Sequence, residues 1–170
     1  MTTLIPVSMS YDLKFMYHLP VSKPEILPKF YPNSLTDVIN THKDFRKFKY
    51  ILNLSGMEQF YNDLQSEFTI FVPSDVAISN IPEEIFLNMD KTTARAIVKT
   101  STLRRRIPSE LLEDSPASYF ETTDQVNKLF ISNISGRTMI NNCINVVHKD
   151  MMAENGIIHV IDKLIEPLIL

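Results

Sequence analysis

The chain has 170 residues, of which 44% are hydrophobic and 22% charged, with a net charge of -3, and this composition is typical of a soluble globular domain with its own hydrophobic core. Its three widely spaced glycines exclude the glycine-rich loops that bind phosphate groups. One cysteine and four scattered histidines supply neither a disulfide framework nor a zinc motif, and the negative charge disfavours nucleic-acid binding. We therefore expect no cofactor and no metal.

The N-terminal region lacks the features of a secretion signal. No basic segment precedes a continuous apolar run, and Pro6 and Asp12 interrupt the apolar residues that are present. No stretch approaches the roughly 20 apolar residues that a membrane-spanning helix needs. As written, the sequence predicts an intracellular chain without a membrane span.

Residues 1–33 contain five of the ten prolines, four of them at a four-residue spacing. Proline at that spacing favours extended backbone over helix. We interpret 1–33 as an N-terminal Pro-rich arm, which packs along its own domain, stays mobile or binds a partner.

A single domain is predicted for residues 34–170, beginning with helices. Ser34 is a candidate N-cap, and apolar residues recur at helical intervals through two short helices as far as Gly56. A further amphipathic stretch covers 57–64. The run FTIFVP at 68–73 predicts a buried strand, after which Ser74 or Asp75 is placed to cap a helical turn.

The second half of the domain is predicted to be mostly strands. Helices are expected over 83–89 and 91–100, because proline and acidic residues open the first and apolar residues share one face of the second. Short β runs follow at 118–122, 127–133, 138–142, 144–148 and 156–161. Since the helices precede most of the strands, the pattern indicates an α+β fold without βαβ repeats.

Two strings in this domain are similar to the two signatures of the fasciclin-type domain family. The first is TIFVPSDVAI at 69–78, and the second is NGIIHVIDKLIEP at 155–167. The resemblance implies a fasciclin-like wedge of short strands packed with several helices over residues 34–170. It assigns structural roles to the matched positions, which are Thr69, Phe71, Pro73, Asp75, Asn155, Gly156, His159, Ile161, Asp162 and Pro167.

His159 and Asp162 suggest an acid-base pair, but the predicted strand argues against it. Residues three apart on a strand point to opposite faces. Both faces of 156–161 are largely apolar, so we expect a central, covered strand in which His159 satisfies a buried backbone group. The resemblance agrees, since fasciclin-type domains are not generally enzymes, and we expect no catalytic residues.

Two segments are candidates for partner binding. Asp150-Met151 stands where adhesive members of the family have an Asp-Ile pair implicated in integrin binding; alternatively, Asp150 caps a turn and Met151 packs inward. The Tyr-His pair of many members is replaced by Thr100-Ser101. The run Arg104, Arg105 and Arg106 could contact phosphate or an acidic partner, or form a solvated edge.

The function that these residues favour is a non-enzymatic protein-interaction or adhesion module. Its partner would be a protein or a glycan of unknown identity, and the oligomeric state is not predicted. The alternative is an intracellular small-ligand binder or enzyme on the same scaffold, which would need polar groups converging in a pocket. Members of the family are more often extracellular or at the cell surface.

Overall fold

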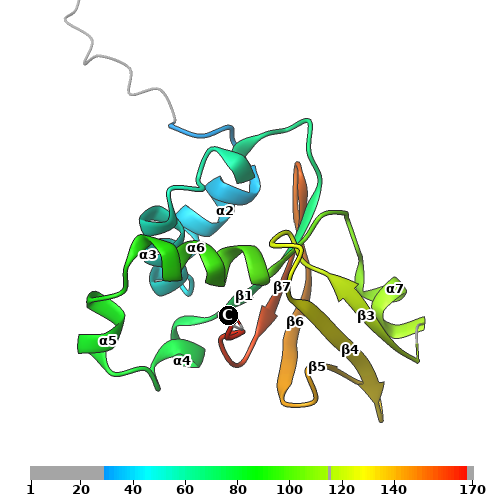
Figure 1. Cartoon of the computed structure of the whole chain (residues 1–170). Helices are drawn as coiled ribbons and strands as arrows, with labels where there is room; N and C mark the ends of the chain where they lie inside the picture. The colour runs from blue at the N-terminus through cyan, green and yellow to red at the C-terminus, as the bar shows by residue number, and fades with distance from the viewer. Residues whose placement is uncertain (1–28, 115, 168–170) are drawn as a thin grey trace, which may run out of the picture.

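The computed structural model describes residues 29–114 and 116–167, and most of the predicted Pro-rich arm lies outside these residues. The described chain forms a seven-stranded sheet, with the helices up to residue 100 packed on one side and the short helix at 109–114 on the other (Figure 1). The helices are α2 (Leu35–Thr41), α3 (Arg46–Ser55), α4 (Asp75–Ile78), α5 (Glu83–Leu87), α6 (Lys91–Thr100) and α7 (Ser109–Asp114), with a 3-10 turn η1 (Phe60–Asn62). The strands are β1 (Phe68–Pro73), β2 (Thr102–Leu103), β3 (Ala117–Glu121), β4 (Lys128–Ile134), β5 (Arg137–Ile140), β6 (Ile144–Ala153) and β7 (Gly156–Ile161).

The first helices begin and end where the sequence predicts. The Ser34 hydroxyl accepts a hydrogen bond from the backbone N–H of Asp37 at the start of α2. Helix α3 ends at Gly56, whose φ of 72° is the left-handed conformation that glycine adopts without strain. Both predicted short helices are therefore confirmed.

The sheet has the strand order β2-β1-β7-β6-β5-β4-β3. Strands β1 and β7 pair in parallel, and all other neighbours are antiparallel. All six residues of β7 are buried between β1 and β6. This confirms the predicted central strand and the α+β class.

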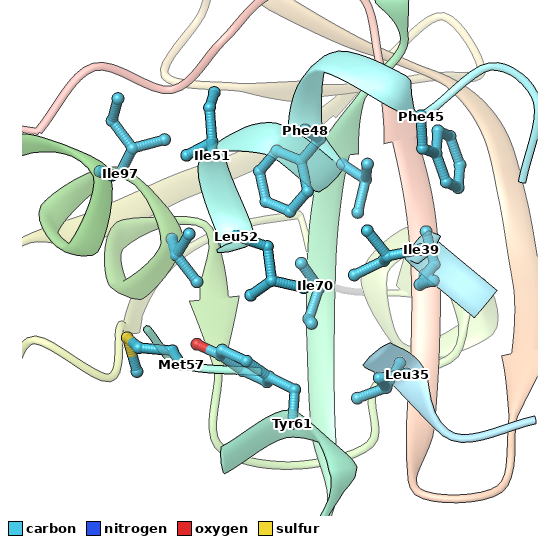
Figure 2. Close-up of a cluster of buried hydrophobic side chains, with 14 of the residues drawn as sticks. Leu35, Ile39, Phe45, Phe48, Ile51, Leu52, Met57, Tyr61, Ile70 and Ile97 are labelled. Atoms are coloured by element: carbon cyan, nitrogen blue, oxygen red, sulfur yellow. The ribbon is translucent and has the colours of Figure 1, made fainter. Parts of the chain in front are cut away.

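Two hydrophobic cores lie on opposite faces of β1 and β7. The first packs α2, α3 and α6 against the sheet (Figure 2). It includes Phe48, Leu52, Tyr61 and Ile70, all fully buried. The second core takes Phe71 from β1, Ile161 from β7 and other side chains from β4, β5 and α7. Alternation along β7 thus sends Ile158 and Val160 into the first core and Ile161 into the second.

The sheet curls so far that its two ends touch. Strands β2 and β3 are the outermost in the order, yet Leu103 forms an antiparallel bridge with Thr122, directly after β3. The backbone N–H of Thr123 also donates to the carbonyl of Thr102 at 3.0 Å. The second core is consequently enclosed by the curled sheet, which gives the wedge expected from the sequence (Figure 1).

Three elements differ from the sequence prediction. The amphipathic stretch 57–64 forms only the short turn η1. Helix α7 was not predicted, because Leu112 is the one apolar residue among its six that packs into a core, which leaves no helical periodicity to recognise. Strand β6 extends through 153 instead of ending at 148, and irregular register between His148 and Met151 disrupts the alternation that would reveal it.

Candidate functional site

Thr69, in the first signature string, holds a later segment of the chain against β1. Its buried hydroxyl donates to the carbonyl of Arg105 at 2.7 Å and accepts from the N–H of Ile107 at 2.8 Å. One side chain thereby replaces two ladder hydrogen bonds. The segment 105–107 is thereby tied to β1.

The other polar residues of the first signature cap two helices. Ser74 accepts from the N–H of Ala77 and begins α4, as the sequence predicts. The Asp75 carboxylate instead accepts from the N–H of Lys47, in the first turn of α3, at 2.8 Å. Pro73 is buried at the end of β1. The string therefore connects the sheet to two helices.

Asn155 and Gly156, in the second signature, join β7 to the N-terminal part of the domain. The side-chain oxygen Oδ1 of Asn155 accepts from the N–H of Leu35 at 2.8 Å, and its side-chain Nδ2 donates to the carbonyls of Tyr61 and Asp63. A Cβ atom on Gly156 would lie 2.1 Å from the carbonyl oxygen of Phe68. Only glycine permits this close approach of β7 to β1.

His159 is fully buried and makes two hydrogen bonds to backbone. Its Nδ1 accepts from the N–H of Asp150 at 3.2 Å, so the proton resides on Nε2, which donates to the carbonyl of Ile107 at 2.9 Å. Burial lowers the pKa of His159 more than the hydrogen bond to Ile107 and the charge of Asp150 raise it. The imidazole is therefore held neutral and is shielded from solvent.

Asp162 does not meet His159. Its carboxylate accepts from the backbone N–H of Asn145 at 2.8 Å and from the Asn145 amide at 3.0 Å. These bonds attach the end of β7 to the start of β6. The contacts of Asp162 are those of a structural residue.

Asp150 lies at the irregular point of β6 with a φ of 60°. Its carboxylate accepts from both the backbone N–H, at 2.9 Å, and the hydroxyl of Ser109, the first residue of α7. Burial raises the pKa of Asp150, but the two bonds from Ser109 together with nearby charges outweigh it and lower the pKa below its usual value. Met151 is half-buried against the first core. The carboxylate is thus occupied by a contact to another element of the domain, and Met151 packs partly inward.

The three consecutive arginines occupy different environments. Arg106 forms an ion pair with Glu67 at 3.1 Å and donates to the carbonyls of Ala153, Glu154 and Gly156 at 3.0–3.4 Å. It therefore clamps the turn between β6 and β7. Arg104 and Arg105 are exposed and make no ion pair among the described residues.

Aromatic rings lie beside the two exposed arginines. The Arg104 guanidinium lies 5.8 Å from the centre of the Phe60 ring, and that of Arg105 lies 5.8 Å from the centre of the Phe120 ring. Tyr119, next to Phe120 on β3, is 71% exposed. We call Arg104, Arg105, Tyr119 and Phe120 the seam surface, because they flank the seam where β2 meets β3.

The comparisons with known proteins agree with this architecture. The model of the Fasciclin domain matches residues 43–167. The chain belongs to the fasciclin domain family. Human periostin is 25% identical over 136 residues, which cover 79% of this chain and 16% of periostin. A fasciclin domain pair from the insect cell adhesion molecule fasciclin I superposes with a TM-score of 0.66 at 22% identity, covering 82% of this chain and 51% of that structure.

No site for a metal or a membrane segment is found in this fasciclin domain over the described ranges 29–114 and 116–167. No group of three or more His, Cys, Asp or Glu residues is placed to hold a metal ion. No helix there is long and apolar enough to cross a bilayer. A groove of about 740 Å³ lies between the segment around Ile81 and the C-terminal segment that includes Pro167. Its lining contains neither His159 nor His148.

Sequence reasoning missed the residues that complete these sites. Ser109 binds Asp150 from 41 positions away, and Phe60 and Phe120 reach the arginines from separate elements. The arginine run alone shows no neighbouring aromatic residue in the sequence. The signal that could have helped is Pro108-Ser109 followed by Glu110, a combination typical of a helix start.

Proposed function

We propose that this fasciclin domain is a non-enzymatic binding module that contacts a protein or glycan partner through the seam surface. The observation that supports the proposal is a difference in where polar side chains find their partners. The polar residues of both signatures make their hydrogen bonds inside the domain, whereas Arg104 and Arg105 extend into solvent beside aromatic rings. Exposed arginine and aromatic side chains are the types enriched where proteins bind one another.

The relatives support the class of function. Fasciclin I is described as an insect cell adhesion molecule, and adhesion requires contact with another molecule. This chain spans 16% of periostin and about half of the fasciclin I structure. We therefore extend to it the role of an interaction module, with a preformed surface that docks without large rearrangement.

The Asp150-Met151 segment is the less suitable docking surface. Binding through the Asp150 carboxylate would compete with both hydrogen bonds from Ser109 and expose the start of α7. The enzyme alternative is also disfavoured. His159 is inaccessible, and its described hydrogen bonds end on backbone atoms of Asp150 and Ile107. A general base must reach the proton it removes.

The test is proximity labelling in the native source cells, combined with fractionation to locate the chain. The parent is compared with Arg104→Glu/Arg105→Glu and with Asp150→Asn, which keeps a residue type that tolerates positive φ. We expect the charge-reversal variant to lose a specific set of neighbours that Asp150→Asn retains. If the two arginine substitutions change no neighbour while Asp150→Asn does, the seam surface is not the docking site.

A further inference from the structure

Strands β2 and β3 are joined by one bridge at the seam and separate beyond it. Beyond the bridge between Leu103 and Thr122, no other isolated bridge between β2 and β3 occurs in the described parts of the chain. The reason is Thr69, whose hydroxyl binds both Arg105 and Ile107 and holds 105–107 on β1. A notch of about 260 Å³ is left between this segment and β3.

The outer edge of β3 faces this notch. In an antiparallel pair, alternate residues direct their backbone groups toward the partner strand. The backbone N–H of Thr122 donates to the carbonyl of Asn127 on the β4 side at 3.3 Å. Because alternate residues share a direction, the backbone N–H and C=O groups of Phe120 and Ser118 also point toward β4. The backbone N–H and C=O groups of Tyr119 and Ala117 therefore point away from β4, as in an edge strand that is open to another chain.

The pairing of β4 with β5 gives the same assignment independently. Phe130 lies opposite Tyr119 in the register. Its carbonyl accepts from the N–H of Asn141, after β5, at 2.7 Å, and its N–H donates to the Asn141 side chain at 3.0 Å. The backbone N–H and C=O groups of Phe130 thus point toward β5. They form no hydrogen bond with the backbone groups of Tyr119, which lies opposite.

The notch carries positive charge. Arg104 and Arg105 line it, and neither makes an ion pair with a described carboxylate. Glu121 also lines the notch and lies opposite Lys128 in the register of β3 and β4. Arginine beside an open strand edge favours a segment that brings both carboxylates and an extended backbone.

We propose that an acidic, extended peptide segment of a partner protein binds here by adding a strand to the outer edge of β3. Its backbone would pair with Tyr119 and Ala117, and its carboxylates would contact Arg104 and Arg105. This inference rests on the proposed function and names the chemistry of its partner. A second copy of the chain fits less well, because pairing β3 with β3 would bring the arginines of two copies together. A sulfated glycan would satisfy the arginines but not the free backbone groups.

The probe is a fluorescent ten-residue peptide that alternates Glu with Val, blocked at both ends. Its matched control alternates Lys with Val. Fluorescence anisotropy with the full chain is expected to give micromolar binding to the Glu peptide, weakening at least tenfold as NaCl rises from 50 to 500 mM, and no binding to the Lys peptide. In NMR spectra, the amide signals of Ala117 and Tyr119 should shift on titration.

Two pairs of variants separate backbone pairing from charge. Tyr119→Pro removes the outward N–H but no bond to β4, since proline is tolerated on the free side of an edge strand. Tyr119→Thr removes the same side chain and keeps the N–H. We expect Tyr119→Pro to weaken binding at least tenfold more than Tyr119→Thr. Arg104→Gln/Arg105→Gln should also weaken it at least tenfold, with Lys128→Gln as the control.

Several results would overturn the inference. Absence of binding to the Glu peptide at 1 mM would do so, as would equal affinity of Tyr119→Pro and Tyr119→Thr. Tight binding of a heparin-derived oligosaccharide, lost in the double arginine variant, together with no peptide binding, would assign the notch to glycans. That last result would still leave the seam surface as a docking site. The proposed docking site would be overturned only if the Arg104→Glu/Arg105→Glu variant kept all neighbours of the parent in the labelling experiment.

Discussion

The β6–β7 end and the β2–β3 seam of this fasciclin domain use polar residues in opposite ways. At the β6–β7 end, the polar side chains of Asn155, His159 and Asp150 all bind other parts of the chain. At the seam, Arg104 and Arg105 have aromatic neighbours but no ion pair within the described ranges. The contrast indicates that the signature residues hold the chain together, and it supports our proposal that a partner binds where the chain has no signature.

A physical reason underlies this separation. A buried polar group that loses its partner costs about 1–3 kcal/mol, so Asn155 and His159, which are both buried, have little freedom to change. Exposed side chains at the seam can change with effects within about 0.5 kcal/mol. Stability measurements on matched variants in the two regions therefore test whether the regions differ in this way.

The largest effect is expected for Gly156→Ala. The new methyl group would lie 2.1 Å from the carbonyl oxygen of Phe68 and 2.8 Å from a methyl carbon of Leu35. Strands β1 and β7 would have to separate, and we expect a loss of about 4 kcal/mol or more. The control is Gly136→Ala, where no atom lies within 4 Å and the φ of 79° alone should cost about 1 kcal/mol. If urea unfolding gave the same loss of unfolding free energy for Gly156→Ala and Gly136→Ala, the close approach of β7 to β1 would not be the reason that glycine is needed at 156.

Ile161→Ala tests the central strand of the same end. Its side chain is fully buried in the second core, so truncation should cost about 2–5 kcal/mol. The matched control is Val147→Ala on β6, where the side chain is 58% exposed and the change should stay within about 0.5 kcal/mol. A loss below about 1 kcal/mol for Ile161→Ala would contradict the buried position of β7.

The sequence predicted the parts of the fold that depend on local patterns. The cap at Ser34, the stop at Gly56 and the apolar run of β7 are each visible within a few residues. Contacts between distant residues were not predictable, because Thr69 with Arg105 and Asp150 with Ser109 arise only when the sheet curls. The single run of three arginines likewise gives no sign that Arg106 is used internally and the other two are not.

The neutral state of His159 predicts a pH dependence at the β6–β7 end. Since burial keeps its folded pKa below 6.5, the unfolded chain binds a proton that the folded chain does not as pH falls below about 6.5. The free energy of unfolding should therefore decrease between pH 6.5 and 5, by up to about 1.4 kcal/mol per pH unit. His159→Gln should therefore flatten this slope.

The lowered pKa of Asp150 does not interfere in that window. Its contribution is present above about pH 4 and is lost only at lower pH, because its folded pKa lies below its usual value. The two groups can thus be separated by urea unfolding at pH 7, 6 and 5. An identical slope in His159→Gln and the parent would mean that the imidazole is not held neutral.

The smallest and most selective effect is expected within the arginine run itself. Arg106→Gln removes an ion pair to Glu67 and the clamp on the carbonyls of Ala153 and Glu154, so it should cost about 1–2 kcal/mol. Arg104→Gln and Arg105→Gln should each stay within about 0.5 kcal/mol, because both side chains are exposed. Thermal unfolding of the three single variants measures the stability cost at each arginine. Equal losses at all three positions would place the seam arginines in the same structural role as Arg106, and the contrast between the two regions would no longer hold.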